Sequence, residues 1–393
     1  MYIKVQPGIM GKGYIFCLFL WSFLFSITRQ STLDGTLLSI AAILFTIVWA
    51  LIRIFIVIKV LTDEMSLVAF IKIFFLALLS FVTYLYNDSN FLIAFAWFIV
   101  GAKGINYKFA VRAIFLSQLF TVIILFGLSK IGYIENAIFF RKDLDNNMIR
   151  YSYGFDHPNT LAARIFQIFC SWLFLRKEKL NLADCFLGFV LAFVSFRFTN
   201  SRTVYYLLLL LSFLILLNLL YKKFPINLDQ MIKKLSRLLY LVPLFVVVIV
   251  LNFDRIFSYI RSFATGTILS RIQLIKSYLD FYGVSLFGKP IISTYSDNII
   301  DYNFYALDNS YVYLLIGFGI IFATIFLMAY FIKIKQFWKN GEYVITVIMI
   351  MYLLYGLFET TLIKFTFNFT LIFLADFLWK NSKKACEIEF KRT

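Results

Sequence analysis

Residues 36–60 read TLLSIAAILFTIVWALIRIFIVIKV and carry only two charged side chains, Arg53 and Lys59. An α-helix needs about 20 mainly apolar residues to cross the roughly 30 Å hydrocarbon core of a bilayer. The lipid core offers no water to the backbone, so a run of this length and composition crosses it as a helix. This stretch therefore predicts a transmembrane helix and sets the class of protein.

Apolar runs of the same kind recur along the chain. Helices are expected at 14–30, 36–60, 66–86, 91–106, 109–134, 159–175, 182–199, 203–221, 238–253, 309–333, 342–360 and 364–380. The 393 residues are 62% hydrophobic and 15% charged, whereas soluble proteins carry about 25% charged residues. We therefore expect an all-α fold, a polytopic bundle of about twelve transmembrane helices. It should form a single membrane domain over residues 1–393.

The formal net charge of +17 would favour nucleic-acid binding in a soluble protein. In a membrane protein, Lys and Arg instead collect in the cytoplasmic connections and face anionic lipid. Counting basic residues in alternate connections places both termini and the 222–237 connection in the cytoplasm. The long connections at 135–158 and 254–308 then lie outside, and no nucleic-acid partner is expected.

The first apolar run, from Tyr14 to Ile27, follows two lysines as the core of a signal peptide would. No small-residue cleavage site comes after it, so we expect a retained first helix. The four cysteines include no C-x-x-C pair, and the chain has one histidine. This composition predicts neither a disulfide framework nor a metal centre, and no cofactor is expected.

Within the second long connection, residues 270–282 have the spacing of an amphipathic helix. Its expected apolar face consists of Ile272, Ile275, Leu279 and Tyr282. Ser270 can cap its start and Gly283 can end it. Such a helix is expected to lie on the outer membrane surface.

Arginines in the outer connections are not explained by the charge rule for topology. They are Arg141, Arg150, Arg197, Arg202, Arg255, Arg261 and Arg271. The planar guanidinium binds phosphate through two parallel hydrogen bonds, which lysine cannot match. This set favours binding of a lipid-linked diphosphate. The alternative is ordinary ion pairing with neighbouring aspartates.

Residues 200–203, Asn-Ser-Arg-Thr, form a short outer connection before a predicted helix. Ser201 can cap that helix, which places Arg202 in its first turn. A cation is unfavourable there, but a bound anion would remove the conflict. Arg197 lies just before this connection. The alternative is that these arginines reach toward lipid headgroups.

Residues 154–159, Gly-Phe-Asp-His-Pro-Asn, close the first long connection. Pro158 suits the first turn of a helix, so the segment should mark a helix start near the outer surface. His157 is the only imidazole and could transfer a proton at neutral pH. The alternative is that His157 only caps its own helix.

Three acidic segments are further candidates. Asp143 and Asp145 match the D-x-D of metal-dependent transferases, but their loop shows no strand pattern, so we give them no role. Asp308 opens a predicted helix in the sequence Asp-Asn-Ser-Tyr, and Glu359 lies near the outer end of another. Ionisable groups at membrane depth are functional candidates, although Glu359 could instead pair with Lys364.

Taken in order, these segments resemble the Wzy-type polysaccharide polymerases of the O-antigen ligase and polymerase superfamily. The resemblance rests on 154–159, on 200–203, on the Arg271-led helix before Leu286-Phe287-Gly288, on 308–311 and on Glu359. It covers roughly residues 100 to 380. Each motif is short, so their order and shared outer placement carry the resemblance.

The resemblance implies a metal-independent glycosyltransferase of the bacterial cytoplasmic membrane that acts on the outer face. It would move a growing glycan from undecaprenyl diphosphate onto an incoming lipid-linked repeat unit, making capsule, O-antigen or exopolysaccharide. A flippase and a chain-length regulator are expected protein partners, beside membrane lipids. The expected catalytic residues are His157, Asp308 and Glu359, and the expected binding residues are Arg150, Asn159, Arg197, Arg202, Arg271 and Tyr311.

Two other functions fit the sequence. A ligase of the same superfamily would hand finished glycan to another acceptor. A flippase or transporter of lipid-linked sugars would also have many spans, but such proteins favour helices broken near the membrane midplane. The spans here are expected to be mostly uninterrupted, and the polar residues singled out above lie in the outer connections.

Overall fold

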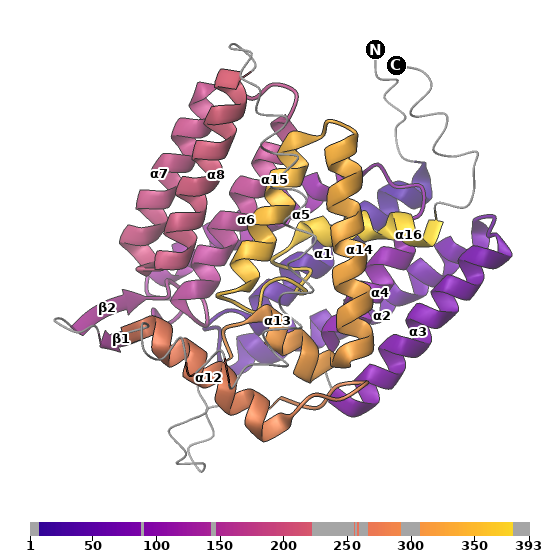
Figure 1. Cartoon of the computed structure of the whole chain (residues 1–393), viewed down its shortest axis with the longest axis horizontal. Helices are drawn as coiled ribbons and strands as arrows, with labels where there is room; N and C mark the ends of the chain where they lie inside the picture. The colour runs from indigo at the N-terminus through magenta and orange to yellow at the C-terminus, as the bar shows by residue number, and fades with distance from the viewer. Residues whose placement is uncertain are drawn as a thin grey trace. The chain divides into compact units, whose positions relative to one another are not determined.

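The computed structural model describes residues 8–87, 90–142, 147–221, 266–291 and 307–379, together with Arg255 and Ser258. The helix expected at 238–253 and the 222–237 connection lie outside these residues. The α-helices are α1 (Ile9–Arg29), α2 (Gly35–Thr62), α3 (Leu67–Asn87), α4 (Asn90–Gly101), α5 (Tyr107–Lys130), α6 (Pro158–Arg176), α7 (Leu182–Thr199), α8 (Arg202–Tyr221), α12 (Gly266–Tyr282), α13 (Ser310–Tyr313), α14 (Gly319–Lys339), α15 (Tyr343–Gly356) and α16 (Asp376–Trp379) (Figure 1).

In this described part, seven helices are long and apolar enough to cross a membrane. They are α1, α2, α3, α5, α7, α8 and the stretch Ser310–Lys339 that contains α14. Helix α2 shows the expected surface, since it buries only Ile52, Ile56 and Lys59 and leaves its other apolar side chains at least partly exposed. Apolar side chains exposed in this way are expected to face lipid. The chain is thus a multi-pass helical membrane protein, and the total of about twelve spans stays a prediction.

The structure separates into two compact units, which are described one by one. The first unit comprises Met1–Leu76, Ala94–Leu219 and Phe365–Thr393, and the second comprises Ala77–Ile93 and Leu220–Lys364. In the first unit α1 packs on α2 and α5, α5 on α6, and α6 on α7. A Cβ at Gly188 of α7 would come within 2.0 Å of Ser212 Oγ and 2.4 Å of the Phe169 ring. Glycine at this position therefore allows α6, α7 and α8 to pack closely.

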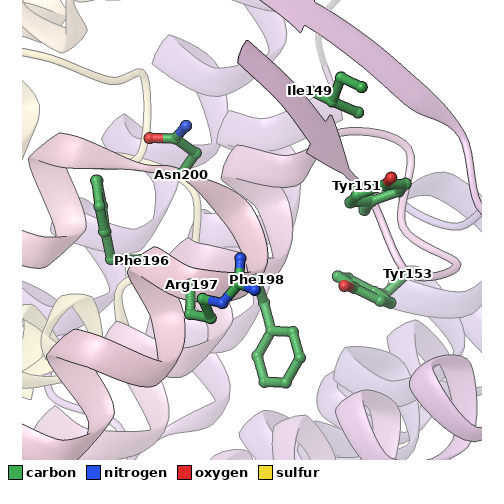
Figure 2. A pocket seen from close by; sticks show the side chains of 7 residues that line it. All are labelled: Ile149, Tyr151, Tyr153, Phe196, Arg197, Phe198 and Asn200. Carbon is green, nitrogen blue, oxygen red and sulfur yellow. The ribbon is translucent and has the colours of Figure 1, made fainter.

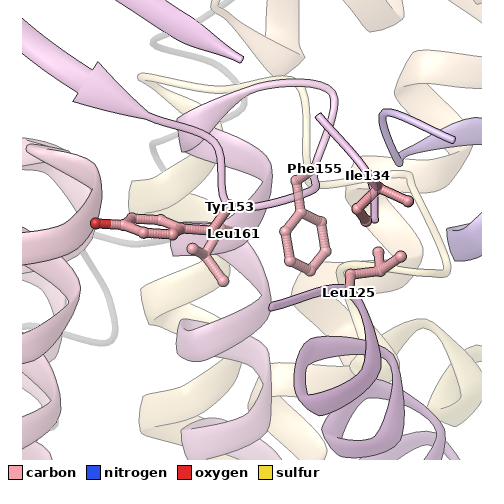
Figure 3. Packing of buried hydrophobic residues seen from close by; sticks show 5 residues of the cluster. All are labelled: Leu125, Ile134, Tyr153, Phe155 and Leu161. Carbon is pink, nitrogen blue, oxygen red and sulfur yellow. The ribbon is translucent and has the colours of Figure 1, made fainter. Parts of the chain in front are cut away.

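The connection 135–158 contains a β-hairpin, which was not expected from the sequence. Strand β1 (Ile138–Lys142) pairs antiparallel with β2 (Asn147–Tyr151). The expectation that strands are lacking around the D-x-D was therefore wrong, although Asp143 and Asp145 themselves lie outside the described residues. The chain leaving β2 is held by a buried cluster of Leu125, Ile134, Tyr153, Phe155 and Leu161 (Figure 3).

In the second unit α14 packs on α15, and its start is broken. After α13, the π-helix η1 (Leu314–Phe318) leads to Gly319, whose φ is +81°. The freed N–H of Ile320 donates to Ser285 O at 3.0 Å, and Lys289 N–H donates to Ile316 O at 2.8 Å. A Cβ at Gly319 would lie 2.3 Å from Leu286 O. The expectation of uninterrupted spans was wrong here, because a neighbouring segment bonds to the backbone at the break.

The prediction of one continuous helix at 364–380 was also wrong. Helix α15 ends at Gly356, turns follow, and the 3₁₀-helix η2 (Phe369–Ala375) precedes α16. The side chain of Asn368 accepts the N–H of Thr370 at 3.1 Å, and its position matches a helix cap. Local side-chain bonds of this kind compete with a continuous helix.

Candidate functional site

The second unit brings together several residues singled out in the sequence. Asn309 is the N-cap of α13, and its Oδ1 accepts the N–H groups of Tyr311 and Val312, both at 3.0 Å. Its amide nitrogen donates to Leu357 O at 3.1 Å. Asn309 therefore ties the start of α13 to the end of α15.

Ser310 continues this link. Its hydroxyl donates to Glu359 O at 2.5 Å and accepts the N–H of Leu362 at 3.1 Å. Tyr311 is buried, and its hydroxyl donates to Leu353 O at 2.8 Å. The turn that carries Glu359 is thus fixed against residues 309–311. The hydroxyl of Tyr311 also holds α13 against α15. The expected role of Tyr311 in binding substrate stays a prediction.

Arg271 lies beside this turn. Its Nη1 donates to Phe358 O at 3.1 Å, and its Nη2 lies 3.8 Å from Asp308 Oδ2. The guanidinium also lies 5.8 Å from the centroid of the Phe358 ring. Arg271 therefore lies beside Asp308 and beside the turn that carries Glu359. We call Arg271, Asp308 and Glu359 the Arg271 cluster.

Helix α12 differs from its prediction at one end. It begins at Gly266, so the prediction that Ser270 caps its start was wrong, and Arg271 lies in the second turn. The predicted end is confirmed, because Gly283 has a φ of +61° and its N–H bonds to Leu279 O at 2.9 Å. The buried ring of Tyr278 joins a cluster with Leu307, Val312 and Ile316 and thereby fixes α12 beside α13 (Figure 1). Its position on the outer membrane surface stays a prediction.

The first unit contains the other predicted residues. Arg150 of β2 is buried, and its Nε donates to Thr199 O at 2.8 Å. Its Nη2 donates to Asn159 Oδ1. Arg150 and Asn159, both expected to bind substrate, are thus bonded to each other and link β2 to α6 and to the end of α7.

His157 is the N-cap of α6, as the alternative reading of this residue expected. Its Nδ1 accepts the N–H of Asn159 at 3.0 Å, and Pro158 occupies the first helical position. Burial, with a smaller contribution from the charge of Arg150, lowers the pKa of His157 to about 4. The imidazole is therefore neutral at pH 7, and with Nδ1 accepting a bond its proton is on Nε2. In this state the Nε2–H group is a donor, and Nδ1 already accepts a hydrogen bond. The carboxylates of Asp308 and Glu359 are therefore better candidates for the base, and the expected role of His157 stays a prediction.

Arg197 lines a pocket of about 470 Å³. Figure 2 shows Ile149, Tyr151 and Tyr153 along one side, and Phe196, Arg197, Phe198 and Asn200 from the end of α7 along the other. Arg197 was predicted from the sequence as a site residue, whereas Tyr151 and Tyr153 were not. The signal for Tyr151 was the alternation of residues 149–151, Ile-Arg-Tyr, which places Ile149 and Tyr151 on one face of a strand.

Arg202 is exposed and opens α8, as predicted, and Asn200 ends α7 in the left-handed conformation with a φ of +50°.

Arg164 was not predicted from the sequence as a site residue. It is fully buried in α6, donates to Thr366 O and to Gln30 Oε1, and lies 4.2 Å from the centroid of the Phe367 ring. A charged residue inside an apolar run was its signal in the sequence.

Among the described residues, no group of three or more His, Cys, Asp or Glu side chains could hold a metal ion. Arg255 is exposed, the side chain of Arg141 is not described, and Arg261 lies outside the described residues.

Comparison with known proteins finds no matching family model and no matching curated protein. The resemblance to Wzy-type polymerases therefore stays a prediction.

Proposed function

We propose that the chain is a membrane glycosyltransferase that polymerises undecaprenyl-diphosphate-linked oligosaccharide repeat units on the outer face of the bacterial cytoplasmic membrane. Both termini would then be cytoplasmic. The observation that carries the proposal is the Arg271 cluster, in which a guanidinium lies 3.8 Å from Asp308 and beside the turn that carries Glu359.

The reaction needs two kinds of group, and the Arg271 cluster contains both. An acceptor hydroxyl attacks the anomeric carbon of the donor sugar, the bond from that carbon to the phosphate oxygen breaks, and the diphosphate leaves. Arg271 would stabilise the charge that develops on the diphosphate. Asp308 or Glu359 would accept the proton of the attacking hydroxyl.

Arg271 keeps capacity for such a ligand. A guanidinium has five N–H donors, and one of them bonds to Phe358 O. The 3.8 Å separation from Asp308 is longer than a hydrogen bond, and both side chains are about one-third exposed, at 31% and 35%. An entering diphosphate could therefore form charge-assisted bonds with Arg271.

The position of Asp308 favours a site at a membrane surface. Asp308 lies two residues before Ser310–Lys339, a stretch long and apolar enough to cross a membrane. The Arg271 cluster would then lie at the end of this span, near the headgroups. A lipid-linked diphosphate has its reacting groups at this depth.

A flippase or transporter of lipid-linked oligosaccharides is the second candidate, because the break at Gly319 and the turns after Gly356 interrupt helices. Transporters place their substrate sites near the midplane, whereas the Arg271 cluster lies beside the start of the candidate span Ser310–Lys339. A ligase of the same superfamily would use the same chemistry with another acceptor.

Deletion of the gene, with analysis of the glycan and of its lipid carrier, separates these functions. Loss of a polymerase leaves single repeat units on lipid at the outer face and removes the long chains. Loss of a flippase leaves the units on the inner face, and loss of a ligase leaves long chains on the lipid carrier. Wild-type protein should restore long chains, and Asp308→Asn together with Glu359→Gln should not.

A further inference from the structure

The pocket beside Arg197 combines features that the Arg271 cluster does not use. Two side chains from the hairpin side, Tyr151 and Tyr153, carry hydroxyls, and Asn200 adds an amide. Phe196 and Phe198 supply apolar rings on the opposite side (Figure 2). Aromatic faces with a few polar groups around them are typical of small-ligand sites.

The hairpin presents Tyr151 to the pocket because of its position in strand β2. Side chains at alternate positions of a strand share a face, so Ile149 and Tyr151 line the pocket while Arg150, between them, bonds to Thr199 O and Asn159 on the other face. The buried bonds of Arg150 thus fix the orientation of this side of the pocket.

Tyr153 has an unusual backbone conformation. Its φ is +49°, and among the described non-glycine residues only Asn200, also at the pocket, shares a positive φ. An asparagine is common at this position after a helix, but a bulky residue in the left-handed region is strained, and such strain clusters at functional sites. The conformation is held by the N–H bond to Asn136 Oδ1 at 2.8 Å.

The ring and the hydroxyl of Tyr153 lie in different surroundings. Its ring packs into the cluster of Leu125, Ile134, Phe155 and Leu161, and its hydroxyl points away from that cluster (Figure 3). The ammonium of Lys130 lies 4.9 Å from the centroid of its ring. The hydroxyl of Tyr153, rather than its ring face, is therefore the group offered to a ligand.

We propose that this pocket binds a sugar ring that carries an acidic group, as a glycan subsite distinct from the Arg271 cluster. The apolar face of a pyranose would pack on the aromatic side chains, and its hydroxyls would bond to Tyr151, Tyr153 and Asn200. Arg197 is exposed at the pocket and would bind the carboxylate through its planar fork. The inference rests on the proposed function only in expecting a glycan as the ligand class.

Binding can be measured without any polymerisation. Full-length protein in phosphatidylcholine nanodiscs is titrated with tetragalacturonate as the acidic probe and maltotetraose as the neutral probe, and saturation-transfer NMR reports affinity. We expect tetragalacturonate to bind more tightly than maltotetraose. Arg197→Gln should weaken tetragalacturonate at least tenfold and leave maltotetraose within about twofold, and Arg197→Lys should fall between it and wild type. Tyr151→Ala should weaken both probes.

The matched control is Arg112→Gln, which removes the same charge from an exposed residue of α5 that does not line the pocket. It should change affinity by less than about twofold, with thermal-unfolding midpoints checked for every variant. Absence of probe binding to wild type, or an equal loss in Arg112→Gln, would overturn the proposal. Loss of tetragalacturonate binding when the nanodiscs contain phosphatidylglycerol would overturn it too, by identifying a lipid-headgroup site. The probes carry no lipid diphosphate, so these results do not depend on whether the chain polymerises.

Discussion

Arg271 and Asp308 lie 3.8 Å apart at a point where the main-chain oxygen of Phe358 already fixes the guanidinium. The pair joins an amphipathic helix to the residues that open α13. Each side chain is about one-third exposed, so mutual attraction adds little stability, at most about 1 kcal/mol. The partly exposed pair thus leaves room for the proposed role of Arg271 in binding a diphosphate.

Substitution of Arg271 should affect turnover more than stability. Arg271→Ala would remove the proposed contact to the developing diphosphate charge, and we expect a rate loss of roughly a hundredfold or more. Arg271→Lys keeps the charge without the bidentate geometry, so it should also be impaired. Glycan chain length and the amount of protein in the membrane are measured together. The control is Lys276→Ala, which removes an exposed ion pair with Asp280 from the same helix and should leave chain length unchanged; normal long chains from Arg271→Ala would refute the assignment.

Asn309 should instead be a stability residue. Asn309→Ala removes two cap bonds and the bond to Leu357 O, which should cost about 1–3 kcal/mol. The thermal-unfolding midpoint in detergent should fall clearly. Ser277→Ala removes only a local bond to Gln273 O and should change the midpoint little. Equal midpoints for the two variants would contradict the role given to Asn309.

The pH dependence of stability should reveal the buried imidazole of His157. Its pKa is about 4 in the folded protein, below the ordinary value of about 6.5. Between these values the unfolded chain takes up a proton and the folded chain does not, so stability is complete above about pH 6.5 and falls as pH drops toward 4. His157→Asn keeps a capping side chain without the titration. Its unfolding midpoint should therefore fall less than that of wild type over this range, and parallel curves would contradict the account.

Topology is tested with single cysteines in a cysteine-free background. Ser277→Cys on α12 should react with an impermeant reagent in intact cells, because the basic residues place this region outside. Lys179→Cys, between α6 and α7, should react only after permeabilisation. The reverse pattern would invert the orientation assigned to the chain.

The sequence predicted well what depends on local composition. Long apolar runs identified α2, α5 and α8, because a bilayer requires such lengths. It could not predict the break at Gly319, where the freed N–H of Ile320 bonds to Ser285, a residue distant in the chain. The turn at Glu359 likewise depends on the side chain of Ser310.

For the candidate site, the sequence predicted the residues but not how they are arranged. Arg271, Asp308 and Glu359 were chosen from their residue types, and the fold brings them together in the second unit. Arg150 and Asn159 were chosen in the same way, but the fold bonds them to each other. The position of Tyr151 depends on the β-hairpin, and the residues 135–158 had been expected to form a connection without strands.

The most direct test of the central claim uses purified protein in liposomes with undecaprenyl-diphosphate-linked repeat units, no nucleotide sugar and no other protein. We predict glycan chains of many repeats, formed equally well in the presence of EDTA, and no chains from Asp308→Asn combined with Glu359→Gln. Movement of single units across the bilayer without any elongation would contradict the proposed polymerase and identify a transporter.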